Sequence, residues 1–156
     1  IDVRGNPGGY LDSAVNISSY FLPLDETVVI ESYGGITPDE IHVSKGFADI
    51  EKPKKLVILV DGGSASASEI VAGALSEKAG AILVGEKTFG KGSVQELIPI
   101  SNTTSLKITI AHWLTPLRKS INKEGIMPDY IVKQTADDVK KGVDLVCGRV
   151  IKNITK

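Results

Sequence analysis

The segment KLVILVDGGSASASEIVAGALSEKAGAILVG, residues 55–85, decides the fold class. Its first six residues form a continuous apolar run, which is typical of a strand covered on both faces. Glycines then lead into a stretch of helical character, Ser64 to Lys78, that ends at Ala79-Gly80, and residues 81–85 form a second apolar run. Strand, helix and strand at this spacing predict a right-handed crossover between parallel strands. The segment therefore predicts an α/β fold built from βαβ units.

The sequence on either side of this unit predicts further elements. Residues 1–3 have the character of a strand end, and the turn Gly5-Asn-Pro-Gly-Gly9 follows them. Hydrophobic periodicity predicts a helix over residues 10–22, a hairpin of strands 26–33 and 40–44, and an antiparallel hairpin of strands 96–100 and 106–110 with one face exposed to solvent. It also predicts one amphipathic closing helix over residues 136–154, whose apolar face carries Val139, Val143, Val146, Val150 and Ile154. A polar connection over residues 45–55 and an irregular segment over residues 113–129 lie between these elements.

Composition limits the classes of function. The chain has 156 residues, 42% hydrophobic and 24% charged, with a formal net charge of -1, which predicts a single globular domain over residues 1–156. Lysine and arginine are not concentrated in any one segment, so the sequence does not predict a nucleic-acid or membrane-surface partner. The single cysteine, Cys147, stands among apolar neighbours and is predicted to be a small buried side chain. Because the chain begins at Ile1 without methionine, we expect it to be a fragment.

Three glycine-rich elements follow predicted strands: Asn6 to Gly9, Gly62-Gly63 and Gly85 to Gly92. In open α/β sheets, binding sites assemble at the edge where the strands end, and glycines there let a ligand approach the backbone. The sequence therefore predicts that these three elements wall a cleft.

The third element, GEKTFGKGS at residues 85–93, resembles a nucleotide-binding P-loop but does not match it. A P-loop ends in Lys followed directly by Ser or Thr and leads into a helix. Here Gly92 separates Lys91 from Ser93, and the sequence that follows alternates in the manner of a strand. The pattern argues against bound nucleotide and leaves Lys91 to be explained.

The second element offers a candidate nucleophile. Ser66 and Glu69 form the spacing of a capping box, in which the serine caps the helix and the glutamate bonds back to it. From local sequence alone, this structural interpretation is favoured over a nucleophilic serine. The first amides of the same helix would nevertheless stabilise an oxyanion placed in the cleft.

A serine nucleophile requires a base. His42 and His112 both lie in predicted strands, where a structural role is more common. A lysine can serve instead if an apolar pocket disfavours its charged form and lowers its pKa. Lys91, between Phe89 and Val94, is expected to be better desolvated than its rival Lys87.

Four segments resemble the C-terminal processing peptidases, or tail-specific proteases, which are serine endopeptidases with a Ser-Lys dyad. They are IDVRGNPGG (1–9), GGSASASEIVAGAL (62–75), VGEKTFGKGSVQ (84–95) and LTP...IN..GI.PD (114–129), and they occur in the order typical of the family. One departure is the segment after Thr115-Pro, which has Arg118 and Lys119 where the family commonly has glycine and arginine.

This resemblance implies a crotonase-like peptidase core that needs no metal or organic cofactor. It implies that Ser66 is the nucleophile, Lys91 the general base and Gln95 an assisting residue. The oxyanion hole would combine the Ala67 amide with that of Gly8 or Gly9, a choice that the sequence leaves open. Because Gln95 would lie roughly 13 Å from Lys91 on a straight strand at about 3.3 Å per residue, we expect a bend or helical turn between them.

The resemblance also implies partners and a setting. The substrates would be proteins or peptides with exposed C-termini, and the full-length chain would carry a cap region and a PDZ domain that are absent here. The expected compartment is extracytoplasmic and bacterial. The alternative outside enzymology is a binding module, since the same fold family includes retinoid-binding relatives. Such relatives are expected to lack the Ser-Lys pair.

Overall fold

The computed structural model describes residues 1–47, 53 and 55–153. Most of the predicted polar connection, residues 45–55, lies outside these ranges. None of the helices in the described ranges has the length and apolar character that a membrane crossing requires.

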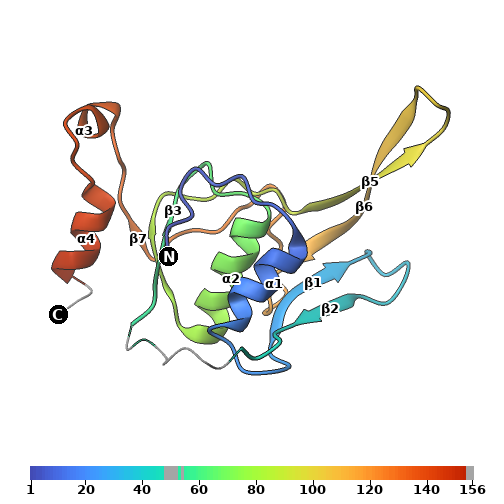
Figure 1. The fold of residues 1–156 in the computed structure, drawn as a ribbon, viewed down its shortest axis with the longest axis horizontal. Helices are drawn as coiled ribbons and strands as arrows, with labels where there is room; N and C mark the ends of the chain where they lie inside the picture. The colour runs from blue at the N-terminus through green and yellow to red at the C-terminus, as the bar shows by residue number, and fades with distance from the viewer. Residues whose placement is uncertain (48–52, 54, 154–156) are drawn as a thin grey trace.

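The predicted βαβ unit is confirmed and forms the centre of the molecule (Figure 1). Strand β3 (Val57–Val60) leads through helix α2 (Ala67–Ala79) to strand β4 (Ile82–Gly85), and the two strands pair in parallel with Val57 opposite Ile82. Helix α2 ends at Gly80, whose left-handed backbone (φ 66°) is the conformation that glycine adopts most readily. Strand β7 (Tyr130–Ile131) completes this sheet beside β4.

The second sheet is antiparallel and contains both predicted hairpins. Its strand order is β2-β1-β6-β5, with bounds of Thr27–Ser32 for β1, Glu40–Val43 for β2, Ser93–Pro99 for β5 and Ser105–Leu114 for β6. The strands of the second hairpin are longer than the alternation alone indicated.

The core lies around α2 and helix α1 (Leu11–Ser19), which pack against each other. Helix α2 contacts β1 of one sheet and β4 of the other, so it joins the two sheets. The main core cluster combines the fully buried Ile58, Ala72 and Leu75 with Val28 and Val29 of β1. This packing of α2 between the two sheets fixes the position of its N-terminus, which lies beside the glycine-rich turns.

The prediction of one wet face for the β5–β6 hairpin is wrong. The hairpin projects from the body, and its outer half is exposed on both faces (Figure 1). Leu97 is 64% exposed and Leu106 48% exposed, because no other described element covers them. Only the inner end of β6, around Ala111 and Trp113, is buried.

The prediction of one closing helix is also wrong. Residues 133–153, here called the C-terminal arm, contain two helices, α3 (Ala136–Lys140) and α4 (Leu145–Asn153). Gly142 between them has φ 68°, a conformation that ends a right-handed helix. Cys147 is exposed and not buried, because α4 turns the neighbouring Val146 toward Leu59 and Val84 of the parallel sheet. Ile154 lies outside the described residues.

A close approach of β3 and β4 makes a specific demand on Gly85. A Cβ atom at this position would lie 2.0 Å from the Val60 carbonyl oxygen, and the backbone has φ 133°. Gly85→Ala is therefore expected to lower the free energy of unfolding by roughly 2–4 kcal/mol, as measured by urea denaturation. Gly148→Ala, where no atom lies within 4 Å, is the matched control and should leave stability unchanged or raise it. Equal midpoints for the two variants would contradict this account.

Candidate active site

The three glycine-rich elements meet at one end of α2, as predicted. The N-terminal turn, defined as Arg4–Gly9, is tied to the start of α2 because the Ala65 amide donates to the Asn6 carbonyl at 3.0 Å. Residues 86–92, here called the lysine loop, are tied to the same place because the Phe89 amide donates to the Ser64 carbonyl at 3.0 Å. All three walls of the site therefore converge on residues 64–66.

Ser66 occupies a strained backbone conformation at the N-cap of α2, with φ 56° and ψ -119°. Non-glycine residues rarely adopt positive φ, and such strain often occurs where a side chain must be presented to a ligand. A sharp turn from strand to helix is the way in which α/β hydrolases expose a nucleophilic serine. The turn is crowded, since a Cβ atom at Gly8 would lie 2.8 Å from Ser66 Cβ.

The predicted capping box is present, and it leaves a role open for the Ser66 hydroxyl. The Ser66 amide donates to Glu69 Oε2 at 2.9 Å, and the Ser66 carbonyl accepts from the Glu69 amide at 2.9 Å. The Ser66 side chain also faces the Glu69 amide, as a capping box requires, but it makes no side-chain cap hydrogen bond. The structural and chemical interpretations of Ser66 are compatible.

Glu69 does more than close the capping box. Its side chain is fully buried and accepts four hydrogen bonds from two segments of the chain. Oε2 accepts from the amides of Ser66 and Lys91, each at 2.9 Å, and Oε1 accepts from Thr88 Oγ1 at 2.6 Å and the Gly90 amide at 2.7 Å. Because the backbone nitrogens of Ser66 and Lys91 donate to the same oxygen, Glu69 Oε2, they cannot be further apart than the combined length of these two hydrogen bonds.

Sequence reasoning missed this second role of Glu69. The capping-box spacing accounts for the bond to Ser66, and nothing local indicates that the same carboxylate holds a loop 20 residues away. The only available signal was the concentration of backbone donors that Gly90 and its neighbours could supply to an acceptor.

Lys91 is held by its backbone, and its side chain is exposed. The expectation that apolar neighbours desolvate it is wrong for the described residues. Phe89 is 65% exposed, because the backbone amides of Gly90 and Lys91 and the side chain of Thr88 are turned toward Glu69, while the side chains of Phe89 and Lys91 face outward. Lys87 is exposed as well.

Gln95 lies in β5 and is exposed. Of the expected bend or helical turn between Lys91 and Gln95, the helical turn is absent, since Ser93–Pro99 is a strand. The pairing with β6 instead shifts register between Val94 and Gln95, where Ile110 is the additional residue of a bulge. Because a strand and not a helix follows Lys91 and Gly92, the lysine loop also lacks the geometry of a P-loop.

The two histidines differ in their distance from the lysine loop along the sheet, since His112 lies opposite Ser93 and His42 lies on β2. His42 on β2 is 3.5 Å from Glu31, and His112 is exposed on β6. Neither is among the residues that hold Ser66.

Two backbone amides beside Ser66 are available as donors. Within residues 1–47, 53 and 55–153, the amides of Gly9 and Ala67 donate to no protein acceptor. The Gly8 amide is occupied, since it donates to Asn6 Oδ1 at 2.9 Å. The Ala67 amide is the first of α2 and so carries part of the positive end of the helix dipole.

An apolar cavity of about 240 Å³ adjoins these amides. Its wall includes Gly9, Ala67 and Ser68, and side chains of α1 and α2 complete it: Ser13, Ala14, Ile17 and Val71. A side chain that enters this cavity would bring its own backbone close to Ser66.

Arg4 holds the other end of the N-terminal turn. Its guanidinium contacts Asp2 at 2.6 Å and Asp144 of the C-terminal arm at 2.9 Å. The bonds to Arg4 lower the pKa of both carboxyl groups and raise the pKa of the guanidinium. Since both carboxyl pKa values lie below their ordinary range, the ion pairs are fully formed at neutral pH and are lost only as the pH falls through those lowered values.

Comparison with known proteins identifies the family to which the chain belongs. Residues 1–132 match peptidase family S41. The chain is 40% identical over 148 residues to a carboxy-terminal-processing protease of Bartonella bacilliformis, covering 95% of this chain and 34% of that protein. It is 40% identical over 136 residues to carboxy-terminal processing protease CtpB of Bacillus subtilis, covering 86% of this chain and 27% of that protein.

Solved structures show the same fold. The photosystem II D1 C-terminal processing protease superposes with a TM-score of 0.75 at 35% identity, over 85% of this chain and 33% of that one. Mature CPAF superposes with a TM-score of 0.75 at 16% identity, over 99% of this chain and 43% of that one, which is a likeness of fold alone. The match over residues 1–132 places the chain in a family: it belongs to peptidase family S41.

Proposed function

We propose that this chain is the catalytic core of a serine endopeptidase that hydrolyses peptide bonds near exposed C-terminal tails of proteins. The observation that carries the proposal is the strained Ser66 at the start of α2, tied through Glu69 to the backbone of Lys91. Its relatives are named as carboxy-terminal processing proteases. Because the chain spans about a third or less of their length, the activity is assigned to the full-length protein.

In the proposed mechanism, Ser66 Oγ attacks the scissile carbonyl carbon while the neutral Lys91 amine takes the hydroxyl proton. The tetrahedral intermediate collapses as Lys91 returns the proton to the departing amine, and an acyl-enzyme remains. Water then attacks the ester carbonyl carbon while Lys91 accepts a proton from it. As this second intermediate collapses, Lys91 returns the proton to Ser66 Oγ, the ester C–O bond breaks, and the product leaves with a new carboxyl terminus. No metal or organic cofactor takes part in this scheme.

The oxyanion hole is assigned to the amides of Gly9 and Ala67. Their lack of an internal partner supports this choice over Gly8, whose amide is occupied by Asn6. Donors fixed in advance stabilise the developing negative charge without reorganisation, and losing one such donor typically slows catalysis by about 100- to 1000-fold.

Lys91 must lose its proton before it can act as a base. Because the Lys91 side chain is exposed, we propose that bound substrate supplies the desolvation. A substrate segment lying across residues 86–92 would supply this cover. We retain Gln95 as an assisting residue; the pairing of β5 with β6 shifts register between Val94 and Gln95.

The proposed partners are proteins or peptides with exposed C-termini. A PDZ domain in the full-length protein would capture those termini by strand addition. The proposed location is extracytoplasmic, and the proposed superfamily of the core is crotonase-like.

The dyad assignment is tested by cleavage of casein with the full-length protein. Ser66→Ala and Lys91→Ala are each expected to abolish cleavage, because one removes the nucleophile and the other the base. Lys87→Ala is the matched control from the same loop and should keep wild-type activity. If Ser66→Ala cleaves as well as wild type, Ser66 is only a helix cap and the binding-module alternative takes precedence.

Glu69→Gln tests the tie between the two segments. The amide nitrogen of glutamine would face N–H donors where Oε1 or Oε2 now accepts, so Lys91 and Ser66 would separate. We expect kcat to fall by about 10- to 100-fold, the cost of a small misplacement of reacting groups. Glu77→Gln, which alters the carboxylate at the other end of α2 that holds Thr115 and Leu117, should leave kcat near wild type. Equal kcat values for the two variants would refute the positioning role.

The apolar cavity beside Gly9 and Ala67 predicts a preference for the residue before the scissile bond. Peptides with alanine, valine or leucine there are expected to be cleaved at least about tenfold faster, in kcat/KM, than those with aspartate or lysine, because the cavity wall offers no partner charge. A peptide series that differs only at this position measures the preference. A flat series would exclude the cavity as the binding site for that side chain.

A further inference from the structure

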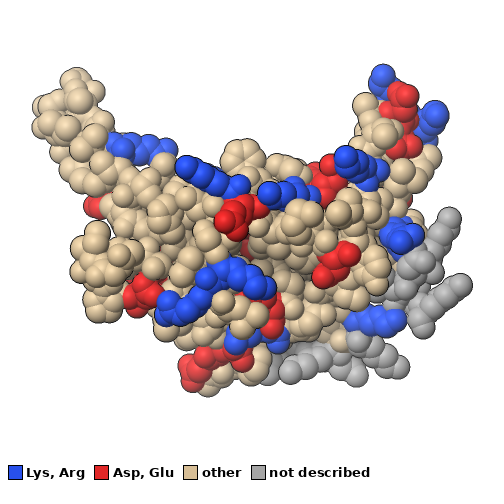
Figure 2. All heavy atoms as spheres, turned by 180° about the vertical axis from the view of Figure 1, so that it is seen from behind, with Lys and Arg blue, Asp and Glu red and all other residues tan. Residues whose placement is uncertain are grey.

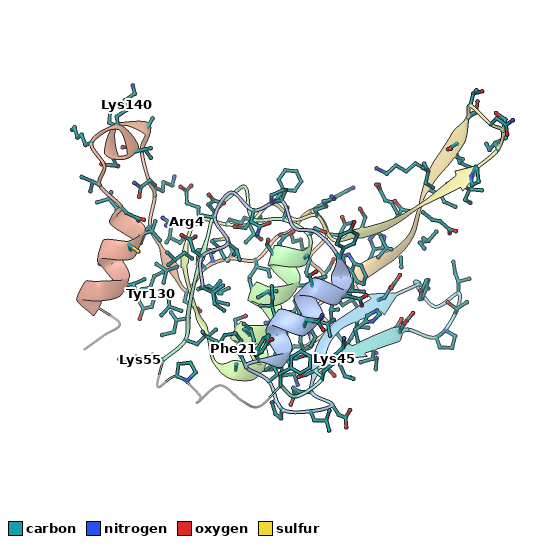
Figure 3. All side chains as sticks on the ribbon, in the orientation of Figure 1. Arg4, Phe21, Lys45, Lys55, Tyr130 and Lys140 are labelled. Carbon is teal, nitrogen blue, oxygen red and sulfur yellow. The ribbon has the colours of Figure 1, made fainter. Side chains whose placement is uncertain are left out.

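Arg4 links the N-terminal turn to a distant part of the chain. Its Nη1 and Nη2 atoms donate to both oxygens of Asp144, at 3.0 and 2.9 Å, and its Nε and Nη2 atoms donate to Asp2. A paired contact of this kind fixes the orientation as well as the distance of the two groups. Figure 3 shows Arg4 on the side of the fold that leads to the C-terminal arm.

Asp144 is held firmly enough to act as an anchor. Its Oδ1 accepts from the Cys147 amide at 2.9 Å, and the next residue, Leu145, donates its amide to Gln134 Oε1 at 3.0 Å. Val146 is 2% exposed and packs against Leu59 and Val84 of the parallel sheet. The position of Asp144 is therefore set by the sheet that also positions α2.

From Arg4 the contact reaches the proposed oxyanion hole through a short run of fixed backbone. The Gly5 amide donates to Asp61 Oδ1 at 2.8 Å, and the Asn6 carbonyl accepts from Ala65 and from Ser68 Oγ. Gly8 and Gly9 follow after Pro7. The turn lies directly against the start of α2, since a Cβ atom at Gly8 would be 2.8 Å from the Ala67 nitrogen. A small displacement of the turn therefore changes the spacing of the Gly9 and Ala67 amides.

The ion pair crosses a gap between the two segments. A cavity of about 640 Å³ is lined by Arg4 and Gly5 on one side and by Gln134, Val143 and Asp144 on the other. Apolar packing does not fill this gap, so the Arg4–Asp144 contact is the direct connection across it. Asp144 also lies beyond residues 1–132, the part of the chain that matches the family.

We propose that Asp144 is a positioning residue for the active site: the C-terminal arm braces the N-terminal turn through Arg4 and keeps Gly9 in place to bind the oxyanion. This inference rests on the proposed function. Since an oxyanion forms only after attack, loss of the brace lowers kcat and leaves KM unchanged. The effect on kcat is also sensitive to salt, because both partners are partly exposed.

The test compares kcat and KM of the full-length protein carrying Asp144→Asn with wild type, on one peptide substrate. Asparagine keeps the size of the side chain and can still accept from the Cys147 amide, but it removes the charge. Asp137→Asn, on α3 of the same arm, is the matched control. Asp144→Ser, which also retains capping, is the second variant if Asp144→Asn does not fold. Melting temperatures are recorded for each variant.

We expect Asp144→Asn to lower kcat by about three- to tenfold with KM within about twofold of wild type, and Asp137→Asn to behave as wild type. Raising the salt concentration should lower the wild-type kcat toward that of Asp144→Asn, whose own kcat should be less sensitive. An unchanged kcat, or a rise in KM alone, overturns the inference even if the melting temperature falls. Cleavage by Ser66→Ala would instead overturn the proposed function.

Discussion

The buried carboxylate of Glu69 is the interaction on which the site depends. An ionised group is costly to remove from water unless donors replace its hydration, and here four donors do so. Two of them come from residues that differ by 25 positions, so one side chain fixes both the turn at Ser66 and the loop at Lys91. The arrangement also explains why the lysine loop needs no regular secondary structure of its own. Two of its amides, those of Gly90 and Lys91, donate to this one acceptor in α2, and the amides of Thr88 and Phe89 donate to the carbonyls of Ile126 and Ser64.

The second constraint is the close approach of backbone segments around that carboxylate. Glycine is required at Gly8, Gly85 and Gly92 because a Cβ atom at each would lie within 2.5 Å of a backbone atom of another segment. These contacts hold the N-terminal turn against the start of α2, strand β4 against β3, and the end of the lysine loop against residues 121–122. On the face opposite to the view of Figure 1, basic and acidic side chains are intermingled and do not form a single-sign field, in line with the weak net charge (Figure 2).

Much of the fold could be predicted because it depends on local patterns. The apolar runs on both sides of α2 and the alternation of the hairpin strands identify β3, β4, β1, β2, β5 and β6 from residues close in sequence. What could not be predicted depends on partners far away. Exposure of Leu97 follows from the absence of a covering element among the described residues, and exposure of Lys91 from the turning of its loop toward Glu69. From sequence alone, Gly142 could either end a helix or lie within one. The packing of Val146 on the parallel sheet favours two separate helices over one continuous helix. The roles of Ser66, Lys91 and Gln95 remain predictions that rest on family resemblance and geometry.

The contact between Arg4 and Asp144 has a consequence for biosynthesis. The two residues are 140 positions apart, and a ribosome adds about 5–20 residues per second. Arg4 is therefore synthesised roughly 7 to 30 s before its partner. Throughout that interval the N-terminal turn lacks one of its fixed contacts, and by the end of it the parallel sheet and α2 have all their residues, since β7 ends at Ile131. The nascent chain can thus assemble its core while its N-terminal turn is still incompletely held.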